Sequence, residues 1–218
     1  MRVTPLGRRA IAVATAAMVA SGIAAGPAAA HAKDKPLGTR SLAAVLTADK
    51  SGFDRNGRDF DILTAAVLAV LKARPGSPVA ALADGKTALT AFIPNDLAFQ
   101  RLVADLQGKR RLPSERQAFS AVAGLGITTV ESVLLYHVVP GATIDKRAAL
   151  RADGAKLKTA AGSTITVNVT GCWRWRQVRL IDADRSDRNP RVVAFNINKG
   201  NRQIAHTINR VLRPVDLP

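Results

Sequence analysis

Apolar residues recur at helical spacing from about residue 42 to residue 150, with polar residues between them. Helix start signals precede several of these segments, namely Ser41, Asp59 or Asp61, and the capping box formed by Ser114 and Gln117. The expected helices cover residues 42–46, 60–73, 99–108, 115–122, 128–139 and 143–150, with Thr143 capping the last. The first part of the mature chain is therefore expected to be mainly helical.

The helix expected at residues 128–139 has the sequence TTVESVLLYHVV and is followed by Pro140-Gly141. Thr128 and Glu131 have the spacing of a capping box, and the proline-glycine pair ends the helical pattern. Tyr136 and His137 stand inside the apolar run. Because a buried polar group without a partner costs about 1–3 kcal/mol, another part of the chain must supply their partners.

Strand patterns dominate after residue 162, where apolar and polar residues alternate with a period of two. The expected strands cover residues 164–170, 178–181, 191–197 and 202–212, and one earlier apolar strand covers residues 88–93. That earlier strand leads through a Pro-Asn-Asp turn into the helix at residues 99–108. Helices that come first and strands that come later are typical of an α+β fold rather than of alternating βαβ units.

Residues 1–32 are read as a signal peptide: a basic start, an Ala-rich apolar segment, and cleavage sites after Ala30 and Ala32. Both cleavage sites remain open, as do general secretion and the twin-arginine route suggested by Arg8-Arg9. Residues 33–38 read as a short linker and residues 39–218 as one domain. We expect no transmembrane segment and a secreted protein, extracellular or associated with the cell wall.

The chain is strongly basic, with a formal net charge of +16. Removal of a signal peptide that carries Arg2, Arg8 and Arg9 leaves +16 − 3 = +13. Such an excess attracts polyanions such as acidic polysaccharides, although singly scattered basic residues also fit a role in solubility. Nothing in the pattern indicates specific recognition of nucleic acid.

The sequence offers little for catalysis or for metal binding. Beyond the signal region only His137 and His206 remain as histidines, Cys172 is the single cysteine, and no catalytic motif surrounds them. The loop at residues 49–59 resembles a calcium loop superficially but lacks the regular acidic spacing and the closing Glu. We therefore expect no catalytic residue, no cofactor, no metal and no internal disulfide.

The segment Cys172-Trp173-Arg174-Trp175-Arg176 is the most distinctive local feature. On a strand, Trp173 and Trp175 would share one face and Arg174 and Arg176 the other. The two indoles could stack on sugar rings while the arginines pair with sulfate or carboxylate. In the alternative interpretation, the indoles belong to the core and the arginines are solvated.

Two segments resemble signatures of the fasciclin domain, the periostin-type adhesion domain family. LTAFIPNDLAFQRL, residues 89–102, resembles the first signature through Thr90, Phe92, Pro94, Asp96 and Phe99. LLYHVVPG, residues 134–141, is similar to the second signature, which includes Tyr136, His137, Pro140 and Gly141. IAHTINRVLRP, residues 204–214, is similar to the closing strand, in which His206 fits and Asn209 replaces a usual acid.

The resemblance covers residues 39–215 and implies an α+β fold, a wedge-shaped β-sandwich flanked by several α-helices. It implies that His137 lies in the core near the first-signature turn, with Asp96 or the Thr90 region as its hydrogen-bond acceptor. It also implies an adhesion or matrix module that acts by surface contact and not by catalysis.

Fasciclin domains of animal matrix proteins are linked to integrins through a Tyr-His segment and through an Asp-Ile pair near the C-terminal strand. Here Tyr136-His137 is present, but Arg191 follows Pro190 where the family motif has an acid. The reversed charge argues against an integrin partner. The sequence thus predicts a secreted, non-catalytic module that binds a cell-surface or matrix partner, with a basic polysaccharide- or polyanion-binding module as the alternative.

Overall fold

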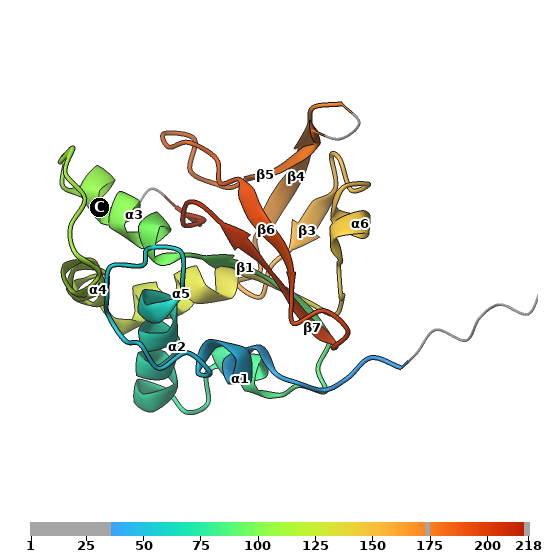
Figure 1. The fold of residues 1–218 in the computed structure, drawn as a ribbon, viewed down its shortest axis with the longest axis horizontal. Helices are drawn as coiled ribbons and strands as arrows, with labels where there is room; N and C mark the ends of the chain where they lie inside the picture. The colour runs from blue at the N-terminus through green and yellow to red at the C-terminus, as the bar shows by residue number, and fades with distance from the viewer. Residues whose placement is uncertain (1–35, 173–174, 216–218) are drawn as a thin grey trace, which may run out of the picture. The chain divides into compact units, whose positions relative to one another are not determined.

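The computed structural model describes residues 36–172 and 175–215 (Figure 1). The signal peptide expected at residues 1–32 lies outside the described residues, as do Trp173 and Arg174. The helices are α1 (Leu42–Leu46), α2 (Asp61–Ala73), η1 (Pro78–Ala83), α3 (Asp96–Leu106), α4 (Glu115–Gly124), α5 (Ile127–Tyr136) and α6 (Lys146–Ala149). The strands are β1 (Leu89–Pro94), β2 (Val138–Pro140), β3 (Lys156–Lys158), β4 (Thr164–Thr170), β5 (Gln177–Ile181), β6 (Val192–Ile197) and β7 (Gln203–Ile208).

Strand β1 lies inside a four-stranded sheet with the order β2-β1-β7-β6. It pairs antiparallel with β2 and parallel with β7, so that Phe92 lies opposite His206. All six residues of β1 are buried, and all six of β7 as well. A strand buried on both faces needs apolar side chains at consecutive positions, which is why LTAFIP lacks the alternation of an exposed strand.

The second sheet has three strands in the order β3-β4-β5. In β4 and β5 the apolar residues alternate with exposed polar ones, so only one face turns inward. The inward residues form one core cluster with side chains from all four strands of the first sheet, the largest being Phe92, and with Tyr136. Packing of two sheets through one shared core is the architecture of a β-sandwich.

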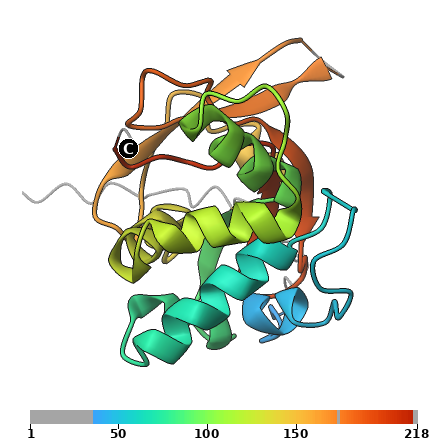
Figure 2. The ribbon, with the colours of Figure 1, turned by 90° about the vertical axis from the view of Figure 1, so that its left-hand side faces the viewer.

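A second core cluster fills the space between the four-stranded sheet and the helices α2, α3, α4 and α5, which gather on one side (Figure 2). Within β1, Ala91 and Ile93 belong to this cluster while Phe92 between them belongs to the other. Thus β1 separates the two cores. The structure confirms the α+β fold class, with helices flanking the sandwich.

Several sequence predictions are confirmed in detail. Ser41 accepts a hydrogen bond from the Ala44 N–H at the start of α1, and Ser114 with Gln117 forms the expected capping box of α4. The strand expected at residues 164–170 has those bounds in the structure. Strand β3 and the 3₁₀ helix η1 were not predicted, because both are too short to show a period.

The predicted start of α5 is wrong. The helix begins at Ile127 after Gly126, with no side-chain cap, and Thr128 and Glu131 both bind Arg74. Instead of capping their own helix, these side chains connect α5 to the end of α2.

The predicted end of α5 is also wrong, because the helix stops at Tyr136. Val138 and Val139 instead pair with β1 as the edge strand β2, which satisfies backbone groups on that side of β1. The cap of α6 is Asp145 and not Thr143, whose hydroxyl donates to the Arg202 carbonyl.

A buried amide on β7 holds the N-terminal helices. The Gln203 side chain is fully buried; its Oε1 accepts from the Leu42 N–H at 2.7 Å. Its Nε2 donates to the carbonyls of Ala81 at 2.7 Å and Asp84 at 2.8 Å. One side chain therefore satisfies backbone groups at the start of α1 and at the C-terminal end of η1.

Replacing Gln203 with Met keeps the volume but removes all three hydrogen bonds. Because buried backbone groups then lose their partner, we expect the free energy of unfolding to fall by about 2–4 kcal/mol in urea titrations. The control is Gln107→Met, an exposed position after α3, which should stay within about 0.5 kcal/mol of wild type. A loss below about 1 kcal/mol for Gln203→Met would contradict this role.

Candidate functional site

The first signature lies on β1, at the centre of the four-stranded sheet. The Thr90 hydroxyl donates to the Ala142 carbonyl at 2.7 Å and accepts from the Ile144 N–H at 2.8 Å. Phe92 is buried, with its ring centroid 5.9 Å from that of His206. Both residues therefore organise the interior and the loop after β2, and neither side chain presents a contact to solvent.

The turn after β1 joins two helices. Asp96 is the first residue of α3, yet its carboxylate accepts hydrogen bonds from the N–H groups of Asp61 at 3.0 Å and Ile62 at 2.9 Å. It thus caps α2, which has no cap of its own at that end, so the predicted capping of α2 by Asp59 or Asp61 is wrong. Pro94 and Phe99 are buried on either side of this turn.

Tyr136 connects the helical side to the second sheet. Its side chain is fully buried, and its hydroxyl donates to the Thr164 carbonyl at 3.2 Å. The same oxygen accepts from the Ala183 N–H at 3.1 Å. The hydroxyl that the sequence left without a partner therefore bonds to β4 and to the loop after β5.

His137 is buried, as the resemblance implied, but its predicted acceptor, Asp96 or the Thr90 region, is wrong. Its Nδ1 lies 2.7 Å from the Val133 carbonyl, and its Nε2 accepts from the Leu212 N–H, 2.9 Å away. The contact with β1 runs through the backbone instead, because the Phe92 N–H donates to the His137 carbonyl at 2.9 Å. The ring therefore carries its proton on Nδ1 and stays neutral. Burial lowers its pKa to about 4.

His206 is held in the same manner. Its Nε2 lies 2.8 Å from the Ile144 carbonyl, its Nδ1 accepts from the Asn196 N–H at 3.2 Å, and burial lowers its pKa.

Pro140 and Gly141, the end of the second signature, are exposed, and Gly141 has a positive φ of 82° that suits glycine. They form the exit of β2 towards α6.

These contacts leave no histidine of the described residues free for proton transfer, because both ring nitrogens of His137 and His206 bond to the backbone. The cavities beside His137 are small, about 30 and 20 Å³, and apolar. A cavity of that size holds a water molecule and not a substrate. The geometry of the signature residues thus supports packing and not catalysis.

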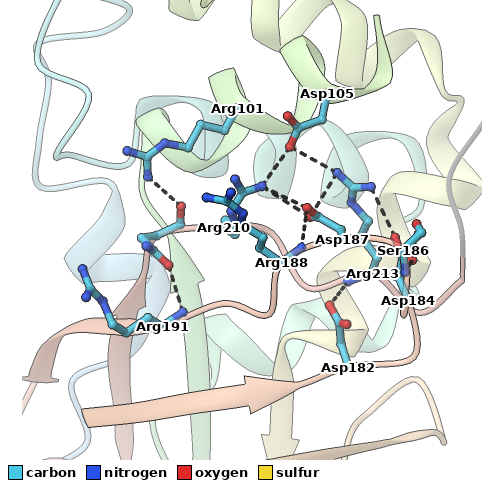
Figure 3. Close-up of polar contacts among 11 residues, drawn as sticks. Arg101, Asp105, Asp182, Asp184, Ser186, Asp187, Arg188, Arg191, Arg210 and Arg213 are labelled. Atoms are coloured by element: carbon cyan, nitrogen blue, oxygen red, sulfur yellow. Dashed lines mark hydrogen bonds and ion pairs between the residues drawn. The ribbon is translucent and has the colours of Figure 1, made fainter. Parts of the chain in front are cut away.

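An arginine–aspartate network, which the sequence did not predict, joins α3, the loop at residues 182–190 and the C-terminal segment (Figure 3). Arg213 is buried and pairs with Asp184 at 3.3 Å and Asp187 at 3.3 Å, while Arg210 pairs with Asp105 at 2.8 Å and Asp187 at 3.1 Å. Only the fold brings these residues together. No spacing in the sequence signals the network.

Local pKa values reflect this network. Burial raises the pKa of Asp182, whose carboxylate accepts from the Arg213 N–H at 2.9 Å, to about 6. Burial also opposes ionisation of Asp184, but hydrogen bonds from Ser186 and the charge of Arg213 lower its pKa overall. Asp184 is therefore ionised at neutral pH and depends on Arg213 for compensation.

Arg191, at the position where the family motif has an acid, lies at the edge of this network. Its side chain is exposed, and its N–H donates to the Asn209 Oδ1 at 2.8 Å. The Asn209 carbonyl accepts from Arg101 at 3.0 Å. The two positions at which the chain departs from the family pattern, 191 and 209, thus bond to each other.

Of the residues that connect β4 to β5, Gly171, Cys172, Trp175 and Arg176 are described, and none of them lies in a strand. Gly171 has a φ of 87°, and a Cβ at this position would lie 2.4 Å from the Trp175 carbonyl oxygen. Trp175 is 80% exposed, which excludes the core interpretation for this indole, and Arg176 is exposed beside it. Nothing is described for Trp173 and Arg174.

The outward side of the second sheet, here called the open face, continues from this connection. It consists of Lys156, Lys158, Thr164, Thr166, Asn168, Thr170, Gln177, Arg179 and Ile181. Strands β3, β4 and β5 contain no acidic residue. A groove of about 710 Å³ lies at one end, and its lining contains Lys156 and Arg185 together with Asp182, Asp184 and Asp187 of the loop after β5. The open face therefore carries basic and hydrogen-bonding side chains, with acidic side chains in the groove at one end.

No single helix among the described residues is long and apolar enough to cross a membrane. Helices α4 and α5 meet these two criteria only when they are taken together, and that pair is bent by 107°.

The buried imidazole of His137 should make stability depend on pH. Its folded pKa of about 4 lies below the unfolded value of about 6.5, so its contribution is complete above pH 6.5 and is lost as the pH falls towards 4. The loss amounts to roughly 3 kcal/mol. An NMR titration of the ring should show the Nδ1–H tautomer and a pKa near 4, against about 6.5 for the same ring in urea. A pKa of 6 or more for His137 in the folded protein would contradict the predicted pH dependence of stability.

Arg213 should be needed for the stability of the fold, because its charge compensates the buried carboxylate of Asp184. Arg213→Met leaves the carboxylate of Asp184, whose side chain is 1% exposed, buried without its partner. We expect the free energy of unfolding to fall by about 3–5 kcal/mol in chemical denaturation. Arg188→Met, which removes an exposed arginine of the same loop, should change it by less than about 0.5 kcal/mol. Equal effects of the two variants would contradict the assignment.

The chain was compared with family models, with curated sequences and with solved structures. The family model of the fasciclin domain matches residues 66–214, which is more than half of the chain. Among solved structures, a FAS1 domain pair from the insect cell adhesion molecule fasciclin I is similar at 13% sequence identity with a TM-score of 0.43. The match covers 70% of this chain and 43% of that one. No curated protein sequence matches significantly. The matched residues include both signatures and the closing strand β7, and the chain belongs to the fasciclin domain family.

Proposed function

We propose that this fasciclin domain is a secreted, non-catalytic adhesion module that binds a cell-surface or extracellular-matrix partner. The observation that carries the proposal is the use of the signature side chains. Tyr136, His137 and His206 are buried, and their polar atoms bond to the backbone of the domain itself. What remains for recognition is the exterior of the fold.

An integrin-type contact gains no support from this geometry. The Tyr136-His137 pair lies inside the domain, and the exposed side chain at position 191 is an arginine. A metal-dependent receptor site requires an acidic ligand at such a contact, so the positive charge of Arg191 opposes it. The basic surface of the domain favours an anionic partner instead.

A second candidate function is the binding of an acidic polysaccharide or a related polyanion. It is favoured by the 80% exposure of Trp175 at the hairpin turn next to the open face. An exposed indole offers a flat apolar surface to a sugar ring, while Lys156, Lys158 and Arg179 supply charges for carboxylate or sulfate groups. Neighbouring threonine, asparagine and glutamine side chains can donate to hydroxyl groups.

Binding of the mature chain to immobilised dextran sulfate and to polygalacturonate tests the second candidate. We expect Trp175→Ala and Arg179→Gln each to weaken binding about five- to tenfold at constant salt. Affinity should also fall steeply as the ionic strength rises. Surface plasmon resonance gives the dissociation constants.

The matched control is Lys72→Gln, which removes an exposed charge from α2 on the helical side. If this variant weakens binding as much as Arg179→Gln, net charge and not the open face is responsible. Binding to a matrix or cell-wall fraction that neither salt nor Trp175→Ala reduces would favour a protein-type adhesion contact and reject the polyanion.

A further inference from the structure

Five carboxylates gather where three helices begin. Asp61, Asp96 and Glu115 are the first residues of α2, α3 and α4, and Asp54 and Asp59 come from the loop that precedes α2. Oxygens of Asp59, Asp96 and Glu115 lie within 4.8 Å of one another, as do oxygens of Asp54, Asp59 and Asp61. We call these five residues the carboxylate cluster. The loop lies beside the N-terminal end of α2 (Figure 2).

Three oxygens of the cluster are buried without a hydrogen-bond partner from the protein. They are Asp59 Oδ1, Asp61 Oδ2 and Glu115 Oε1. Glu115 is 1% exposed and Asp61 is 8% exposed. The other oxygen of Glu115 accepts from the Asp54 N–H at 2.6 Å, which fixes the carboxylate in the cluster. An unpartnered oxygen on a residue this deeply buried is a costly feature that calls for a ligand.

No basic side chain of the described residues forms an ion pair with the cluster. The ion pairs of the described structure involve Glu131, Asp105, Asp184 and Asp187, and none includes a member of the cluster. Arg116, next to Glu115, instead lies over the Phe53 ring at 5.5 Å. The chain as a whole has a formal charge of +16, yet these five acids form a locally negative region without an ion pair.

The pKa values record the same excess of negative charge. Burial, followed by the charges of Asp59, Asp49 and Asp54, raises the pKa of Asp61 to about 6. Burial also raises the pKa of Glu115 and of Asp96. A group that compensates this charge would therefore stabilise the fold.

We propose that the carboxylate cluster binds a divalent cation of the calcium type. The donors are all oxygen atoms, as Ca²⁺ requires, with no nitrogen or sulfur ligand that would favour zinc. The oxygens of each triad lie within 4.8 Å of one another, which is close enough for one calcium ion with Ca–O distances of about 2.4 Å to contact all three. Unlike Mg²⁺, Ca²⁺ accepts the irregular arrangement that a loop and three helix ends provide.

The proposed site also explains why the loop has the wrong spacing for a calcium motif. Asp54, Asp59 and Asp61 come from the loop and its end, but Asp96 and Glu115 are supplied by α3 and α4. The ligands are therefore distributed over 62 positions of the chain, from 54 to 115. A cation bound here joins the loop to the starts of three helices.

The test uses the full chain after treatment with a chelator, and CaCl₂ as the probe. We expect isothermal titration calorimetry to show one site, and the melting temperature to rise by several degrees once Ca²⁺ exceeds the dissociation constant. Asp59→Asn and Glu115→Gln should weaken Ca²⁺ binding at least tenfold. Without Ca²⁺, Asp59→Asn should melt above wild type, because it relieves repulsion, and this order should reverse in excess Ca²⁺.

The matched control is Asp153→Asn, an exposed acid outside the cluster, which should keep the wild-type response to Ca²⁺. Because a buried variant can lose its fold, Asp54→Asn at an exposed loop position provides a second measure and should also weaken binding. The proposal is overturned if wild type shows neither heat of binding nor a change in melting temperature up to about 10 mM CaCl₂. It is equally overturned if folded Asp54→Asn and Asp59→Asn bind Ca²⁺ as wild type does.

Discussion

A neutral imidazole at position 137 joins three parts of the fold that are far apart in sequence. The ring bonds to the Val133 carbonyl within α5 and to the Leu212 N–H of the C-terminal segment, while the backbone of the same residue bonds to Phe92 on β1. Because Nε2 must accept a hydrogen bond, a protonated ring is incompatible with this arrangement. Tyr136 extends the connection to the second sheet. Neighbouring residues of one signature thus hold the helices, both sheets and the C-terminal segment together.

This internal use of the signature determines where recognition can occur. A side chain whose polar atoms are satisfied by the backbone of its own domain has nothing left to offer a partner. The family pattern therefore accounts for the fold, and the contacts specific to this chain must lie on residues outside it. Trp175 and the open face meet that condition, since they are exposed and contribute little to either core.

The sequence predicted features that depend on local spacing and missed those that depend on chain-distant neighbours. The alternation in β4 and the capping box of Ser114 follow from residues within a few positions of each other, and both are confirmed. The partner of His137 lies 75 positions away, so the sequence could indicate that a partner exists but not which one. In the CWRWR segment the alternation is compatible with a strand, but its described residues lie between β4 and β5, where the positive φ of Gly171 allows a turn.

The acidic residues of this basic chain are concentrated in two places. Five acids lie in the carboxylate cluster and four in the arginine–aspartate network, together nine of the sixteen acidic residues. The strands of the open face contain no acid and carry Lys156, Lys158 and Arg179. Asp182, Asp184 and Asp187 of the network line the groove at the end of this face where Lys156 lies, so the positive charge is partly compensated there. By register Lys158 lies opposite Thr164, whereas Arg179 lies opposite Asn168 and nearer to the turn that carries Trp175. The exposed indole and Arg179 are thus on the side of the open face away from these aspartates, where an anionic partner meets the least repulsion.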